Sequence, residues 1–269
     1  MKDKEERSKV MRFTYSWYKE LLKKIKDSDY GMADFINWRE YDKSIILRHD
    51  IDMNLASAVE IAKIEQKVLG TSNSATYFIL VSTNFYNIFS KESRNYIQEI
   101  IKCGGEIGLH FDETQYGIFS EQDLVQQILK EKNILENVVE QEVKVVSMHR
   151  PSKKILSNEI TLKGMINAYA NTYLRDMKYV SDSRRNWRED IDNIISSGEY
   201  ERVCILTHPI WYRESEDSLR KTIWRQIVQG AEDRCYALKN NISDFNSVVA
   251  EQELSGFWEE LRERIDEKG

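Results

Sequence analysis

Four histidines mark the places along the chain where chemistry is expected. They are the only histidines in a sequence of 269 residues, and each comes at or just after the end of a short apolar run: His49, His110, His149 and His208. In a parallel α/β barrel the carboxyl ends of the strands share one face, and active sites form on that face. A single histidine is more often a packing or surface residue than a ligand. Four at equivalent positions predict one common site.

Two carboxylates, Asp50 and Asp52, lie at the same predicted strand end as His49, in the run RHDID. Buried carboxylates are unfavourable unless they are paired or bind a metal. Asp52 could instead cap the following helix, although Asn54 can also do so. Imidazole and carboxylate together are ligands for Zn²⁺ and other first-row divalent ions, whereas Ca²⁺ and Mg²⁺ sites use oxygen ligands. The sequence therefore predicts a divalent metal site, with zinc as the expected ion.

Short apolar runs alternate with stretches of helical periodicity. We expect strands over 44–47, 75–81, 106–109, 143–147 and 202–206, and helices over 54–69, 91–102 and 120–138. This alternation predicts parallel βαβ units with right-handed crossovers. Seven or eight such units in this length favour a barrel, with an open sheet as the alternative.

Composition and charge narrow the class of protein. We expect a single domain over 1–269, with helical extensions at 1–40 and 232–269. Within the second extension we expect a helix over 255–268 that docks on the barrel or contacts a second subunit. The net charge of −6 argues against nucleic acid as the main partner. No apolar run approaches the ~20 residues that cross a bilayer. The charged N-terminal sequence lacks a secretory apolar segment, and three scattered cysteines fit reduced thiols, so we expect a cytoplasmic protein.

Five motifs in order carry a family resemblance. The runs LRHDID, ATYF, GGEIGLHFD, SMHRPS and ILTHP resemble the motif set of the polysaccharide deacetylase superfamily, in a divergent form similar to carbohydrate esterase family 4. The resemblance covers residues 45 to 211. It implies an α/β fold, a distorted (β/α)7 barrel with added terminal helices. It also implies metal-dependent hydrolysis of an amide on a sugar.

The resemblance also implies roles for individual residues. An acidic pair in the first motif supplies a catalytic base and a metal ligand, which correspond to Asp50 and Asp52. Their Asp-Ile-Asp spacing differs from the commoner adjacent pair, so the two roles could be exchanged. Arg150 corresponds to an arginine that orients the catalytic acidic residue of the first motif by a charge-assisted hydrogen bond. His208 corresponds to the histidine that protonates the leaving group.

The second motif departs from the family pattern. His110 corresponds to the first of two histidines spaced four residues apart, but Thr114 occupies the second position. One metal ligand must therefore come from elsewhere. We expect His149 to supply it, ahead of Asp112. His49 ranks third, because its side chain should point to the opposite side of the strand from the catalytic pair.

The expected function is removal of an acetyl or formyl group from an amino-sugar precursor, in surface-polysaccharide assembly. The residues expected to contact the sugar or to support the site are Tyr77, Asp112, Asp182 and Trp211. Two alternatives remain: a catalytically inactive barrel that binds a glycan or a partner, and an amidohydrolase that acts on a non-sugar amide.

Overall fold

The computed structural model describes residues 12–70, 74–157 and 160–266, and the chain divides into two compact units, 1–214 and 215–269. Residues 1–11 of the expected N-terminal extension and 267–269 at the end of the chain lie outside the described residues. The second unit begins earlier than the expected extension at 232–269, because helix α7 (Leu219–Asn241) already begins at Leu219.

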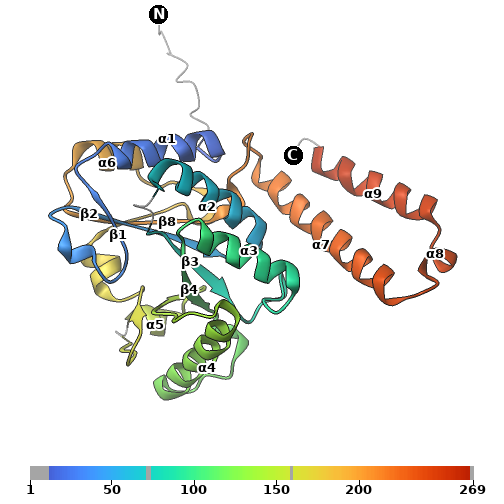
Figure 1. Ribbon diagram of the computed structural model, residues 1–269, viewed down its shortest axis with the longest axis horizontal. Helices are drawn as coiled ribbons and strands as arrows, with labels where there is room; N and C mark the ends of the chain where they lie inside the picture. The colour runs from blue at the N-terminus through green and yellow to red at the C-terminus, as the bar shows by residue number, and fades with distance from the viewer. Residues whose placement is uncertain (1–11, 71–73, 158–159, 267–269) are drawn as a thin grey trace, which may run out of the picture. The chain divides into compact units, whose positions relative to one another are not determined.

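The first unit is built on a sheet of parallel strands (Figure 1). The strands are β1 (Gly31–Ala33), β2 (Ser44–Ile51), β3 (Thr76–Leu80), β4 (Glu106–Phe111), β5 (Val145–Met148), β6 (Ile166–Asn167), β7 (Lys178–Ser181) and β8 (Arg202–Thr207). Their order is β6-β5-β4-β3-β2-β8-β7, with β1 beside β2. Among the described residues no pairing joins β6 to β7, so the barrel is open there. The predicted fold class, an α/β distorted barrel of parallel strands, is confirmed.

Helices follow most strands of this unit. They are α1 (Tyr15–Lys26), α2 (Leu55–Leu69), α3 (Lys91–Lys102), α4 (Glu121–Val139), α5 (Lys153–Ser157) and α6 (Ile191–Ser197). Short 3₁₀ turns lie at Trp38–Glu40, Glu113–Gln115, Ser183–Arg185 and Pro209–Trp211, and a π-turn at Thr172–Asp176. Consecutive helices from α1 to α4 pack side by side. They therefore cover the outer face of the strands that carry the histidines.

Caps define the ends of the two helices that follow candidate site residues. The Asn54 side chain accepts a hydrogen bond from the Ser57 N–H and caps α2, as predicted. Gly70 ends α2 with a positive φ of 62°. Ser120 and Asp123 form a capping box at the start of α4. Because Asn54 caps α2, the Asp52 carboxylate is left for other contacts.

Side-chain alternation along β2 separates the two faces of the barrel wall. Ile46 belongs to an inner apolar cluster with Phe78 and Cys204, whereas Ile45 and Leu47 belong to the larger cluster under the helices. Because successive side chains point to opposite faces of a strand, positions 48 and 50 also face the interior and position 49 faces the helices.

The second unit consists of α7, α8 (Phe245–Val248) and α9 (Glu251–Asp266). Helices α7 and α9 lie side by side (Figure 1). Lys221 pairs with Asp266, and Arg262 with Glu232. The helix expected over 255–268 begins four residues earlier, at Glu251. Among the described residues, no helix is both long and apolar enough to span a bilayer.

Gly108 lies where the inner face of β4 meets an aromatic ring. A Cβ atom added there would lie 2.6 Å from two ring carbons of Phe78. We therefore expect Gly108→Ala to lower the free energy of unfolding by about 1–3 kcal/mol, the usual effect of overpacking, as measured by urea denaturation. The matched control is Gly230→Ala in α7, where a Cβ meets nothing within 4 Å. That control should not destabilise the protein, and equal losses in both variants would contradict the packing argument.

Candidate metal centre

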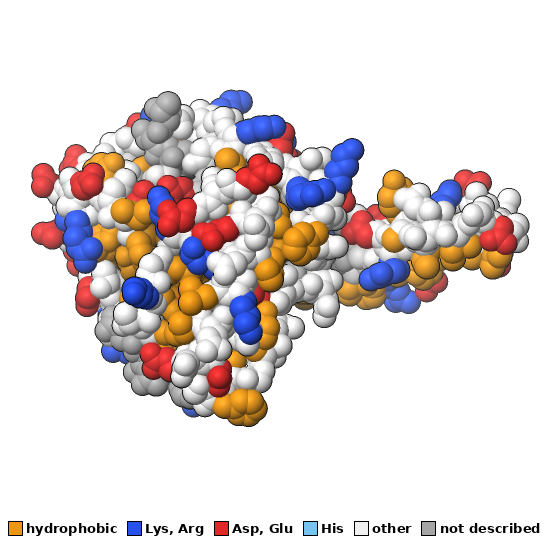
Figure 2. Space-filling view, turned by 60° about the horizontal axis from the view of Figure 1, so that its bottom comes forward, with side chains coloured by type: hydrophobic (Ala, Val, Ile, Leu, Met, Phe, Trp, Pro, Cys, Tyr) orange, Lys and Arg blue, Asp and Glu red, His pale blue; other side chains and the backbone are white. Residues whose placement is uncertain are grey.

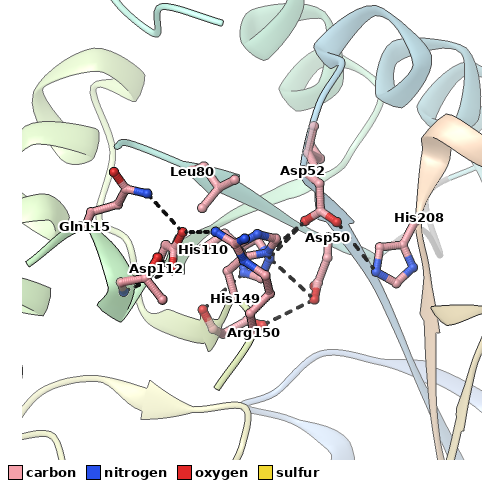
Figure 3. Close-up of polar contacts among 12 residues, drawn as sticks. Asp50, Asp52, Leu80, His110, Asp112, Gln115, His149, Arg150 and His208 are labelled. Carbon is pink, nitrogen blue, oxygen red and sulfur yellow. Dashed lines mark hydrogen bonds and ion pairs between the residues drawn. The ribbon is translucent and has the colours of Figure 1, made fainter. Parts of the chain in front are cut away.

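Three side chains from three strand ends converge on one point. Asp52 follows β2, His110 lies in β4 and His149 follows β5. Asp52 Oδ1 lies 3.2 Å from His110 Nε2 and 3.2 Å from His149 Nδ1, and the two imidazole nitrogens are 3.2 Å apart. One ligand atom from each residue therefore forms a group that could hold a metal ion (Figure 3). These are the three residues that the sequence suggested as ligands.

The donor set fits a divalent transition metal. A tetrahedral ion with bonds of ~2.1 Å has ligand atoms ~3.4 Å apart, close to the three separations observed. His110 Nδ1 lies 3.2 Å from the carbonyl oxygen of Ser147, which can accept its proton. Such a bond selects the tautomer whose Nε2 lone pair is free to bind metal. The side chains of Asp52 and His149 are 18% and 17% exposed, so the site opens to solvent on their side.

The ion pair of Asp50 with Arg48 is the most buried part of the site. The Arg48 Nη2 group donates to both carboxylate oxygens of Asp50, at 2.7 and 3.0 Å. Burial alone would raise the pKa of Asp50, but the Arg48 charge lowers it below its ordinary value. Asp50 Oδ2 also lies 3.7 Å from His110 Nε2. Asp50 is therefore an ionised carboxylate directly beside the ligand group.

His208 lies on the other side of the carboxylates in Figure 3, with Nε2 4.0 Å from Asp52 Oδ2. Its Nδ1 lies 2.6 Å from Asp182 Oδ1, and the Tyr212 hydroxyl donates to Asp182 Oδ2 at 2.9 Å. Burial alone would lower the pKa of His208, but the Asp182 carboxylate raises it to about 9. The imidazolium form is therefore favoured at neutral pH, as an acid that donates a proton requires.

The contacts of Arg150 differ from the expectation that it orients the catalytic acidic residue. Its Nη2 group donates to Asp112 Oδ2 at 2.6 Å, and its side chain is 63% exposed. Arg48, not Arg150, contacts Asp50. Asp112 also accepts hydrogen bonds from Thr114 and Gln115. These hydrogen bonds stabilise the loop that follows β4. Burial alone would raise the pKa of Asp112, but these bonds, with Arg150, lower it to about 2.

Three other expected site residues lie in different surroundings. Tyr77 is fully buried on the helix-facing side of β3, where its hydroxyl donates to Glu65 of α2. It pairs with His49 across the sheet, and the same alternation that turns His49 away from Asp50 turns Tyr77 away from the interior. Trp211, in contrast, lies beside His208, with ring centroids 6.3 Å apart. Asp182 is fully buried and contacts His208, so of the two roles suggested for it the structure favours support of the site over contact with a substrate.

Sequence reasoning missed three residues of the inner face. Arg48 lies two positions before Asp50 on the same strand, and this i, i+2 spacing is the signal that could have identified it. The Ser147 hydroxyl accepts a hydrogen bond from Arg48. The Tyr169 ring lies 5.5 Å from the Arg48 guanidinium carbon. No local pattern indicates that Tyr169 would reach this point.

The known proteins that this chain resembles are found among solved structures. No protein-family model and no curated protein matches the chain. Solved structures do match it. They include the peptidoglycan deacetylase PdaC from Bacillus subtilis, with 22% identity, a TM-score of 0.41, and coverage of 65% of this chain and 78% of that one.

Two further solved structures match this chain over a smaller share of their own length. A CE4 family pseudoenzyme from Bacillus anthracis has 16% identity and a TM-score of 0.40, over 71% of this chain and 62% of that one. A polysaccharide deacetylase from Bacillus cereus has 14% identity and a TM-score of 0.42, over 72% and 57%. All three structures are similar to this chain at low sequence identity.

Metal binding tests the ligand group directly. We expect the purified chain to bind Zn²⁺, and His110→Ala and His149→Ala each to weaken the affinity at least ~100-fold, because losing even a partner of a ligand costs about 10–100-fold. Competition with a chromogenic chelator measures this. Asp112→Asn is the control, since the Asp112 carboxylate is held by the Arg150 loop. If Asp112→Asn alone lost Zn²⁺ binding, Asp112 and not the two histidines would be assigned as a ligand.

The His208–Asp182 pair predicts a pH dependence of stability in the metal-free protein. Because the pKa of His208 is raised from 6.5 to about 9, its contribution is complete below pH 6.5 and is lost as the pH rises through about 9. Asp182→Asn should therefore destabilise the protein most below pH 6.5, and the difference from wild type should shrink towards pH 9. Urea unfolding across this range measures it, and a difference independent of pH would refute the pairing.

Proposed function

We propose that this protein is a metal-dependent hydrolase that removes an N-acyl group, acetyl or formyl, from an amino sugar. The observation that carries the proposal is the convergence of an ionised carboxylate, an imidazolium and a three-residue ligand group at one end of the barrel. Residues distant in sequence supply them: Asp50, Asp52, His110, His149 and His208. The motif resemblance supports the same reaction.

The proposed chemistry assigns one task to each group. A divalent ion held by Asp52, His110 and His149, with zinc as the expected ion, would polarise the amide carbonyl and lower the pKa of a bound water towards ~7. Asp50 accepts the proton of the attacking water. His208 donates its proton to the leaving amine, and Asp182 holds the imidazole in the orientation required. Trp211, beside His208, offers an aromatic surface to the sugar ring.

The protein surface is compatible with a sugar conjugate as substrate. Acidic and basic side chains are interspersed over the face of the molecule in Figure 2. Together with the net charge of −6, this argues against nucleic acid as a partner. Nucleotide-linked and lipid-linked amino sugars, as precursors of surface polysaccharides, are the first compounds to test.

Acyl release tests the proposal. We expect the zinc-loaded protein to release acetate or formate from N-acylated amino sugars. Asp50→Asn and His208→Asn should each lower kcat about 10²–10⁴-fold, as for loss of a general base or acid. Glu106→Gln is the matched control, because Glu106 begins β4 at the end of the strand opposite His110. Coupled detection of the released acid measures the rates.

The outcomes separate the alternatives. Protein that binds metal and sugar without releasing acid would favour the inactive, glycan-binding barrel. Activity on a small cyclic amide but on none of the sugars would move the substrate outside carbohydrates. Release with undiminished kcat in both variants would refute the roles of Asp50 and His208.

A further inference from the structure

Arg48 is an arginine whose side chain is entirely enclosed by the barrel. Its side chain is 0% exposed, and it extends from the inner face of β2 to Asp50 and Ser147. The guanidinium carbon lies 4.7 Å from the centroid of the Phe78 ring and 5.5 Å from that of Tyr169. Aromatic faces thus enclose the cation while its Nη2 edge meets the carboxylate.

This arrangement is not what the stability of a core requires. Taking two charges out of water is unfavourable, and replacing a buried ion pair by apolar residues is often neutral or stabilising. Arg48 also leaves its Nε and Nη1 groups without hydrogen-bond partners among the described residues. Arginine at this position is therefore poorly explained by packing, and its contact with Asp50 is the feature that needs a reason.

The contact restrains both oxygens of Asp50. One nitrogen, Nη2, lies 2.7 Å from Oδ1 and 3.0 Å from Oδ2. The Ser147 hydroxyl, itself bonded to Nη2, lies 3.5 Å from Oδ2. Rotation of the carboxylate would break these contacts, so Oδ2 stays directed towards His110, 3.7 Å away.

We infer that Arg48 is the positioning residue for Asp50, an inference that rests on the proposed hydrolase function. Arg48 acts through Asp50, whose two carboxylate oxygens it contacts. It holds the carboxylate in the orientation in which Oδ2 faces the metal ligands. The arginine that the motif order suggested for this task, Arg150, serves Asp112 instead.

Arg48→Lys tests orientation while retaining the positive charge. A lysine side chain is one bond shorter, so its Nζ does not reach the position from which Nη2 contacts both the carboxylate and the Ser147 hydroxyl. We expect kcat for acyl release to fall by about 10²-fold, the effect of small misplacement of a reacting group, with KM and Zn²⁺ affinity close to wild type. Arg202→Lys, on the neighbouring strand β8 at its amino end, is the matched control and should retain wild-type kcat.

A second measurement does not depend on activity. Arg48→Gln leaves the Asp50 charge buried and unpaired and should lower the thermal midpoint, whereas the double variant Arg48→Gln/Asp50→Asn should recover much of that loss. Additive losses in the double variant would show that the two side chains are not coupled and would overturn the inference. So would wild-type kcat in Arg48→Lys, or loss of kcat in Arg150→Lys alone.

These outcomes differ from failure of the proposed function. A wild-type protein that binds Zn²⁺ but releases no acid from any N-acyl sugar refutes the hydrolase and, with it, the role of Arg48 in hydrolysis. An active wild type with an unaffected Arg48→Lys variant refutes only the role of Arg48.

Discussion

Enclosing two carboxylates at one end of the barrel is the constraint on which the site depends. Asp50 and Asp52 follow each other with one residue between them, and burial alone would raise the pKa of both. The structure keeps both ionised by placing cationic and imidazole groups around them. Those groups come from β2 itself and from the ends of β4, β5 and β8. The strand order therefore determines which side chains can meet the two acids.

Local sequence signals could predict strands β2, β3, β4, β5 and β8, helices α2 to α4 and the place of the site, whereas the short strands β1, β6 and β7 were not predicted. An apolar run that ends in a histidine or an aspartate identifies a strand end, and parallel strands bring those ends together. The partner of Arg150 could not be predicted, because its loop conformation, with a positive φ of 49°, sets which carboxylate it reaches. Tyr77 was misplaced for a simpler reason. Its direction depends on the register of β3 against β2, which the sequence does not state.

The helix-facing side of β2 explains why one histidine of the four, His49, lies outside the site altogether. His49 lies 2.7 Å from Glu65 Oε1 of α2 and 2.6 Å from Thr207 Oγ1 of β8. Tyr18 of α1 donates to the same Glu65 oxygen, at 2.5 Å. A buried network with satisfied partners fixes a unique arrangement, and this one joins two helices to the two strands that carry Asp50 and His208. The inner site is therefore supported by polar contacts directly behind it.

The departure from the family pattern at Thr114 also has a structural account. Its hydroxyl donates to Asp112 at 2.7 Å, and Arg150 holds the other oxygen of that carboxylate. Residues that motif order would place in the reaction thus stabilise the loop after β4. Under the proposed function, His149 supplies the remaining ligand and Arg48 orients the base, each reaching the same point from a different strand. What the chemistry requires is a group of suitable charge within reach of Asp50 and Asp52, and a parallel barrel offers several strand ends from which such a group can come.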